Sequence, residues 1–423
     1  MTWLRSAAIS RRKLAIPAIL GVVVLTAGTF GAYRGLRSSP GDTPINVGAG
    51  GGVGASQNDT VVGRPFIQLS QRADPAISFL TDLTSLGVNP QRMALDPGSA
   101  AIWFADVPGA GKSDRLFRYD TSGALRSFDV PGSLGTPLGS SIAIDGRGHV
   151  ILAEGAEVID LDPATGDHRQ YQIPQSSFAA PFITEPSAYP GINQIAVGAG
   201  NRAYISRINT AAITELDLLG GTMKEIPYPV SFGQVDRLAA ADGNLWITNP
   251  TTNVNGTQPQ TGVIDLATGQ YTPVGRVVTG FADRAEQGTL YAMDPNTGIV
   301  ALDGKQVTEA PSLKVGPQHP GDAYLGFGSN DQMAVDPQRG VLWLASNLRT
   351  DIVRMDTSTG AVTTYDLPVY LTTSYTCPDE SFMNGCKDPV EARSRVGGMA
   401  VDAKGDLYFL EEAFSRIGVI RSP

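Results

Sequence analysis

The sequence predicts an all-β fold, a seven-bladed β-propeller built from four-stranded antiparallel blades. Three observations carry this prediction: a repeated phrase, the spacing of its copies, and the residues of its turns. Between Gln91 and Pro423 a short apolar strand, a Gly/Asp turn and a second apolar strand recur seven times. The second strands centre on anchors 42 to 65 residues apart, namely Trp103, Ile151, Tyr204, Trp246, Tyr291, Trp343 and Tyr408. A period of this size with four short strands per unit is typical of a propeller blade.

The outer half of each repeat predicts a third and a fourth strand, as in Ala212–Pro229 and Asp351–Pro368. Their turns, such as DTSTG and DPATG, place a Gly where φ is positive. The last repeat ends with Ser415–Pro423 and has no fourth strand of its own. We expect Arg64–Ser70, which precedes the first blade, to supply that strand and close the ring, because closure removes an exposed sheet edge.

The first 37 residues predict a membrane segment. Four basic residues, the last of them Lys13, precede an uncharged run of 20 residues from Leu14 to Tyr33. A helix of that length spans about 30 Å, the thickness of one bilayer core. The basic cluster places the N-terminus in the cytoplasm by the positive-inside rule. A cleaved signal peptide is the alternative. Both readings put the propeller outside the cytoplasm, either anchored in the periplasm or at the cell surface, or secreted.

Residues 38–63 are rich in Gly, Ser and Asn and lack an apolar period, so they predict a flexible tether. Residues 64–423 then form one domain, the propeller, which we expect to be monomeric. Without residues 1–37, the chain holds 26 basic and 41 acidic residues, a net charge of −15. Such a surface repels phosphate backbones, so nucleic acid is excluded as a partner.

The chain has two cysteines, Cys377 and Cys386, in one polar loop. Outside the cytoplasm the expected state of such a pair is a disulfide, which would stabilise the fold by roughly 2–3 kcal/mol. Two unpaired surface thiols are the alternative.

A ligand site is expected at the mouth of the ring, because inner strands start and second strands end on the same face. The residues two positions before each apolar inner strand are Gln91, Ser140, Asn193, Asp236, Thr279, Asp331 and Gly397. The last residues of the second strands are Asp106, Glu154, Arg207, Asn249, Asp294, Ser346 and Glu411. Carboxylate and amide oxygens suit Ca²⁺ or Mg²⁺. We expect Asn193, Asp236 and Asp331 to be metal ligands. A solvated rim without a ligand is the alternative.

Three long connections, Pro174–Gly191, Pro311–Asn330 and Pro368–Gly397, are expected to border the same mouth. The second of them contains His319, which is therefore the one histidine placed to reach the mouth as a general base. An ordinary solvated loop histidine is the alternative for this residue.

Repeats such as Val263–Val274 and Ile352–Pro368 resemble those of the streptogramin (virginiamycin B) lyase-like, NHL-type propellers. This resemblance implies a propeller that opens a cyclic lactone antibiotic by elimination, with a His/Glu pair and Mg²⁺ at the mouth. The family's Pro-His-Gly phrase is absent from the blade starts, so the resemblance assigns no catalytic pair. The phrase Gly397–Phe409 is similar to the gluconolactonase and senescence-marker propellers. That likeness implies metal-binding Asn and Asp at blade starts, the residue types of Asn193 and Asp331.

Two functions follow as hypotheses. The first is a membrane-tethered, extracytoplasmic binding or scaffold propeller that recognises a small molecule or a protein at its mouth. The alternative is a lyase or lactone hydrolase that depends on Ca²⁺ or Mg²⁺. The missing Pro-His-Gly phrase favours the first, and the carboxylates and amides predicted around the mouth favour the second.

Overall fold

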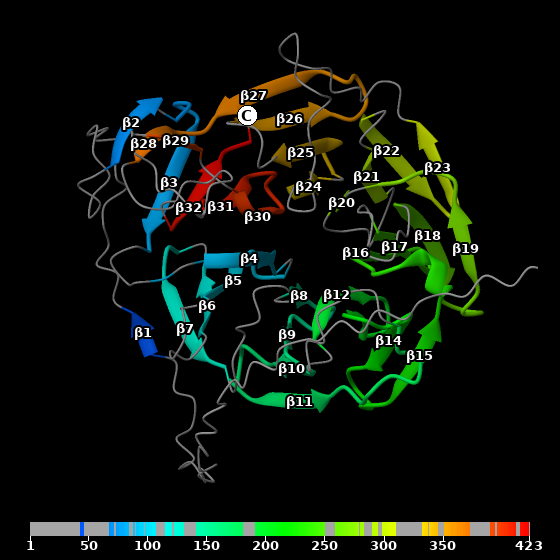
Figure 1. The fold of residues 1–423 in the computed structure, drawn as a ribbon. Helices are drawn as coiled ribbons and strands as arrows, with labels where there is room; N and C mark the ends of the chain where they lie inside the picture. Colours follow the sequence, from blue (N-terminus) through cyan, green and yellow to red (C-terminus); the bar gives the residue numbers. More distant parts are fainter. Residues whose placement is uncertain are drawn as a thin grey trace, which may run out of the picture. The chain divides into compact units, whose positions relative to one another are not determined.

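Seven antiparallel sheets follow one another along the chain in the computed structural model and surround a central axis (Figure 1). The chain divides into two units, residues 1–39 and 40–423, and every described residue belongs to the second. The structure describes residues 43–45, 67–71, 73–83, 88, 90–96, 98–106, 115–120, 122–130, 141–180, 191–249, 259–278, 280–282, 290–294, 298–309, 332–336, 338–345, 351–372, 390–393, 396–411 and 415–422.

The four strands of each blade run from the central axis outwards. The inner strands are β4 (Pro90–Leu95), β8 (Ile142–Ile144), β12 (Ile192–Gly198), β16 (Arg237–Ala241), β20 (Gly280–Phe281), β24 (Gln332–Asp336) and β30 (Val396–Val401). The second strands are β5 (Ile102–Asp106), β9 (Val150–Glu154), β13 (Arg202–Arg207), β17 (Asn244–Asn249), β21 (Leu290–Asp294), β25 (Val341–Ala345) and β31 (Leu407–Glu411).

Third and outer strands complete the blades. The third strands are β6 (Arg115–Tyr119), β10 (Glu157–Leu161), β14 (Ala212–Asp217), β18 (Gln260–Asp265), β22 (Gly298–Asp303), β26 (Asp351–Asp356) and β32 (Arg416–Ile420). The outer strands are β7 (Leu125–Asp129), β11 (His168–Gln172), β15 (Met223–Pro227), β19 (Tyr271–Val274), β23 (Gln306–Glu309), β27 (Val362–Asp366) and, for the seventh blade, β3 (Ile77–Asp82). The predicted seven-bladed architecture is confirmed.

An N-terminal strand closes the ring as expected, but the prediction that Arg64–Ser70 is this strand is wrong. β3, not Arg64–Ser70, pairs antiparallel with β32, in a register that sets Ile77 opposite Ile420. β3 suits the position because its apolar residues serve two interfaces. Ile77 and Phe79 pack between blades six and seven, whereas Leu80 packs between blades seven and one.

The predicted segment belongs instead to a small additional sheet. β2 (Ile67–Gln71) pairs with β28 (Val369–Thr372), which pairs with β29 (Val390–Arg393). The long connection between blades six and seven therefore contains a strand pair of its own. Within the predicted tether, β1 (Thr43–Ile45) pairs with the outer strand β7 and makes the first blade five-stranded.

The hydrophobic core lies between the blades, in seven clusters that each combine residues of two neighbouring blades. β5 illustrates the rule, because Trp103 packs toward blade two while Phe104 packs toward blade seven. Second strands are consequently buried on both faces, and β5, β25 and β31 are buried along their whole length. This explains why these strands have no polar alternation in the sequence.

In five of the outer turns an Asp orders the backbone. In the turn after β26, Asp356 Oδ1 accepts hydrogen bonds from the backbone N–H groups of Ser358 and Thr359 at 2.9 and 2.8 Å. Gly360 then adopts a φ of 72°, which only Gly adopts without strain. Equivalent bonds from the N–H two residues ahead reach Asp120, Asp162, Asp217 and Asp265. The turn prediction is thereby explained by residue chemistry.

The predicted membrane segment, residues 1–37, lies outside the described residues. Among the residues that the structure describes, no helix has the length and apolar character needed to cross a membrane. The only helical element of that part of the chain is a single 3-10 turn, η2 (Val230–Phe232), between blades three and four.

Candidate functional site

The inner strands of all seven blades line a central cavity of about 260 Å³. Its polar lining residues stand at the first position of the repeated inner-strand phrase and are Arg92, Ser141, Gln194, Arg237 and Gln332. In blades five and seven the same position is Gly280 and Gly398. No Asp, Glu or His occurs among the described lining residues, and the remainder of that lining is apolar or Gly. The described lining therefore combines two arginines, two glutamines and a serine with apolar residues and Gly.

Arg92 occupies a bulge at the start of β4. The register shifts between Gln91 and Met93, so Arg92 has no residue directly opposite on β5. Its φ is 54°, in the left-handed region that non-Gly residues rarely adopt. Such a conformation costs on the order of 1 kcal/mol or more, and bulges re-aim side chains near sites. Local backbone strain thus coincides with a cavity-lining arginine.

Neighbouring inner strands are joined by side-chain hydrogen bonds at the same end. The hydroxyl of Ser141 donates to Gln194 Oε1 at 3.4 Å, which links blades two and three. The amide Nδ2 of Asn193 donates to the Val235 carbonyl at 2.6 Å, which links blades three and four. Asp236 follows Val235, and its backbone N–H donates to Thr248 O at 2.9 Å. The structure thus brings two of the three predicted metal ligands, Asn193 and Asp236, to adjacent inner strands, both half-buried.

Three carboxylates predicted to surround the mouth form ion pairs within or beside their own blades. Asp106 is fully buried, and Arg115 donates to its Oδ2 at 2.6 Å from the facing position of β6. Glu411 is also fully buried, and Arg416 Nε donates to it at 2.7 Å. Asp294, 4% exposed, lies 3.7 Å from Arg276. None of the three lines the central cavity. Each of these carboxylates therefore has an arginine as its counter-charge.

Arg207 and Asn249, which end the second strands of blades three and four, contact the connecting segments before and after blade three. Arg207 is buried, donates to the Pro174 carbonyl at 2.6 Å and pairs with Glu225 at 2.5 Å. Gln234 Nε2 donates to Arg207 O at 3.0 Å, and Asn249 Nδ2 donates to Phe232 O at 2.9 Å. These polar strand ends therefore hold two connecting segments of the ring.

Several predicted site residues lie outside the described residues. They are Asp331, His319, Cys377 and Cys386. Glu154 ends β9 in the described backbone, where it pairs with Glu157, but its side chain is not described. Of the three predicted metal ligands, the structure therefore describes Asn193 and Asp236. The disulfide remains a prediction.

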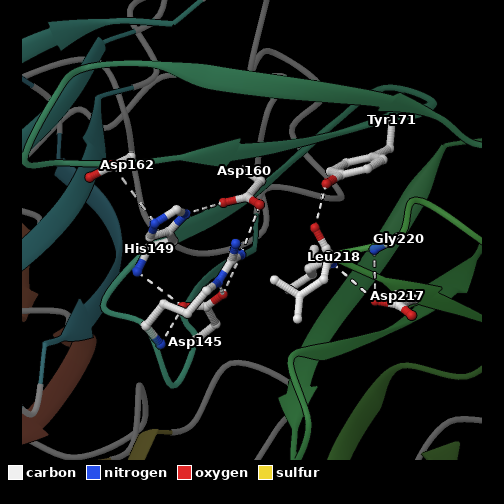
Figure 2. A network of polar contacts seen from close by, with 10 residues as sticks. Asp145, His149, Asp160, Asp162, Tyr171, Asp217, Leu218 and Gly220 are labelled. Atoms are coloured by element: carbon white, nitrogen blue, oxygen red, sulfur yellow. Dashed lines mark hydrogen bonds and ion pairs between the residues drawn. The ribbon is translucent and has the colours of Figure 1, made fainter.

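A second polar cluster lies in blade two, where Asp145, His149 and Asp160 converge (Figure 2). His149 Nδ1 lies 2.7 Å from Asp160 Oδ1, and both carboxylates are buried. The guanidinium of Arg147 donates to Asp145 at 2.6 Å and to Asp160 at 2.8 Å. Burial opposes the charge of Arg147, but these bonds outweigh it and raise the pKa of the guanidinium. An arginine therefore already supplies the positive charge that a metal would bring.

The cavity-lining polar residues were missed by the sequence reasoning, which took the position one residue earlier. The signal was present, because each stands first in the repeated phrase, as in RMALD, SIAID, QIAVG, RLAAA and QMAVD. Arg92 and Arg237 begin two copies of this phrase in a chain that is rich in acidic residues. That pattern could have indicated these positions.

Comparison with known proteins supports the fold. The sequence matches no protein-family model and no curated protein. The structure is similar to a streptogramin B lyase, with 16% identity, coverage of 78% of this chain and 93% of the other, and a TM-score of 0.54. Virginiamycin B lyase from Staphylococcus aureus matches at 14% identity over 82% of this chain and 99% of the lyase, with a TM-score of 0.53. The resemblance expected from the repeats is thereby confirmed among solved structures.

The same comparison does not select an activity. The WD40 repeats of RRP9 match at 10% identity over 83% of this chain and 99% of the other, with a TM-score of 0.54. Propellers with unrelated names thus superpose equally well, and identities this low show the propeller fold alone.

Proposed function

We propose that this chain is an extracytoplasmic binding propeller that holds a small-molecule ligand in its central cavity. The observation that carries the proposal is the polar set at the equivalent first positions of five inner strands. Pockets with an apolar frame and a few convergent polar groups are the usual form of a small-molecule site. Repetition of the polar position around the ring places these residues beside one shared space.

A binding role is favoured over metal-dependent catalysis by the chemistry of the described lining. A general base or a divalent-metal site needs carboxylates or histidines, and the described cavity residues include neither. Asp106, Asp294 and Glu411 are engaged with arginines. Such pairs support blade structure and reduce the carboxylate set on which a metal could draw.

The second candidate is a lyase or lactone hydrolase that uses Ca²⁺ or Mg²⁺ at Asn193, Asp236 and Asp331. One observation favours it: the hydrogen bond from Asn193 to Val235 holds two of these candidate ligands on adjacent strands. The similar structures named as lyases are consistent with this activity but, at their low identity, do not carry it.

Attachment to a membrane and an extracytoplasmic location are part of the proposal. They rest on the basic cluster before the apolar run Leu14–Tyr33 and on the two cysteines of one loop. The acidic net charge supports a soluble ligand rather than nucleic acid.

The proposal is tested by a thermal-shift screen of the full chain against small acids, sugars and amines, followed by a variant that fills the cavity. Gly280 suits this purpose, because a Cβ added there meets no atom within 4 Å and its backbone lies outside the left-handed region. Gly280→Leu should fold and lose the response to any ligand that stabilises the wild type, since a ligand bound only by the native state raises its stability.

Gly275 offers a matched control. A Cβ at Gly275 also meets nothing within 4 Å, but this residue is exposed and does not line the cavity. Gly275→Leu should keep the ligand response of the wild type. Equal responses of the two leucine variants would contradict a cavity site.

A further inference from the structure

We propose that the ligand of the central cavity carries an oxyanion group, a carboxylate or a phosphate, bound by Arg92 and Arg237. This inference rests on the proposed cavity site and adds the chemical class of its ligand. Both arginines line the cavity and both are half-buried. The guanidinium fork matches the geometry of carboxylate and phosphate and stays protonated at all physiological pH values.

The charge of the lining is the first argument. The whole chain has 41 acidic and 32 basic residues, a net charge of −9. The described cavity lining reverses this balance, with two arginines and no carboxylate. A guanidinium group binds anions through charge-assisted hydrogen bonds, whereas the acidic remainder of the chain repels them.

The position of the two arginines is the second argument. Arg92 belongs to blade one and Arg237 to blade four, so two blades separate them on one side of the ring and three on the other. They thus approach the axis from widely separated sides. Gln194 lies on the shorter arc between them, and Gln332 lies on the longer arc. The amides add neutral donors and acceptors suited to hydroxyl or further oxygen atoms of the same ligand.

The backbone is the third argument. Arg92 is held at a φ of 54° in a bulge that removes it from the β4–β5 register. Arg237, by contrast, lies in regular register opposite Thr248. Strained backbone at non-Gly residues concentrates at binding sites, where the surrounding fold maintains it. The cavity, about 260 Å³, is below the roughly 300–1,000 Å³ of drug-sized sites and so fits a small anion.

Calorimetric titration of the full chain in mild detergent tests the inference, with citrate and inorganic phosphate as probes of the two oxyanion sources. Glucose and spermidine serve as neutral and cationic probes. We expect citrate or phosphate to bind, and whichever does identifies the source. Arg237→Gln should weaken that binding about tenfold or more, because a charge-assisted hydrogen-bonded pair is lost. Arg237→Lys should retain part of it, since the charge remains.

Arg169 provides the control, because it is exposed on β11, the outer strand of blade two, whereas the inner strand of that blade lines the cavity. Arg169→Gln removes the same charge and should leave the affinity unchanged. Arg92→Gln should weaken binding as well. Because Arg92 lies in a bulge whereas Arg237 is in regular register, Arg237→Gln is the decisive variant if Arg92→Gln does not fold.

The outcomes separate this inference from the proposed function. Anion binding that is equal in wild type and Arg237→Gln would overturn the inference, because the anion would then sit elsewhere. Binding of glucose or spermidine that Gly280→Leu abolishes, with no binding of either anion, would also overturn it while leaving the cavity site intact. Absence of any ligand sensitive to Gly280→Leu would contradict both.

Discussion

Arg207, which is buried, and Glu225, which is half-buried, form an ion pair in blade three: the guanidinium lies 2.5 Å from Glu225 Oε1, and the two side chains are 1% and 22% exposed. Burial lowers the pKa of Arg207, and the glutamate opposes that effect by favouring the charged form. The pair links strands β13 and β15 and leaves the arginine dependent on its partner.

Glu225→Gln should therefore destabilise the fold by about 3 kcal/mol, because it leaves a buried guanidinium without a counter-charge. Chemical denaturation measures the change. Asp167→Asn, at an exposed position, is the control and should change stability by less than about 0.5 kcal/mol. Equal stability of the two variants would show that Arg207 does not need Glu225.

The outer-turn aspartates predict a loss of stability in acid. A hydrogen bond from the Ser358 hydroxyl and the backbone N–H groups of Thr359 and Ser358 lower the pKa of Asp356 from 3.8 to about 2. As pH falls from about 4 to about 2, the unfolded chain binds this proton before the folded chain does, so protonation favours unfolding. The stabilising contribution is complete above pH 4 and is lost as pH falls through the folded pKa.

Asp356→Asn removes the titrating group while keeping an oxygen acceptor in the turn. Unfolding measured across that pH range should then show a shallower fall of stability than in the wild type. A slope that Asp356→Asn leaves unchanged would show that this turn does not contribute to acid sensitivity.

Ring closure by β3 predicts how the protein responds to N-terminal truncation. Removal of residues 1–72 deletes β2 but retains β3, and the product should elute as a monomer in size-exclusion chromatography. Removal of residues 1–83 exposes the edge of β32, and an open edge of that kind promotes aggregation. The longer truncation should therefore aggregate or unfold. Aggregation that begins with the shorter truncation would instead assign the closing role to the segment around β2.

The extracytoplasmic proposal predicts a disulfide between Cys377 and Cys386. Alkylation of the denatured, unreduced protein purified from its native compartment should label neither thiol, and mass spectrometry measures the result. Reduction before alkylation should label both. Labelling of both cysteines without reductant would contradict the oxidised state and weaken the proposed location.

The fold was predictable because its core is repetitive. Each interface between blades needs the same apolar phrase, so residues such as Trp103 and Trp343 recur at one structural position. Asp356 and its counterparts could likewise be assigned to turns, since an Asp carboxylate bonds the backbone two residues ahead. The blade core is periodic and the Asp turns are local, and features of either type can be predicted from sequence.

Two features were not predictable in the same way. The closing strand was misplaced because Arg64–Ser70 and Ile77–Asp82 both offer short apolar alternation, and only packing on both neighbouring blades distinguishes β3. The cavity residues were missed because the direction of a side chain at a strand start depends on register and bulges. The bulge that holds Arg92 in the lining has no signature in sequence alone.

The melting temperature of the full chain, measured with millimolar citrate and separately with millimolar Ca²⁺ or Mg²⁺, tests the central claim that the ligand binds in the cavity through its arginines. We expect citrate to raise the melting temperature of the wild type, and Gly280→Leu or Arg237→Gln to abolish that rise, with no response to either metal. A rise with Ca²⁺ or Mg²⁺ that Asp236→Asn removes, without any response to citrate, would contradict this account and support the metal-dependent enzyme.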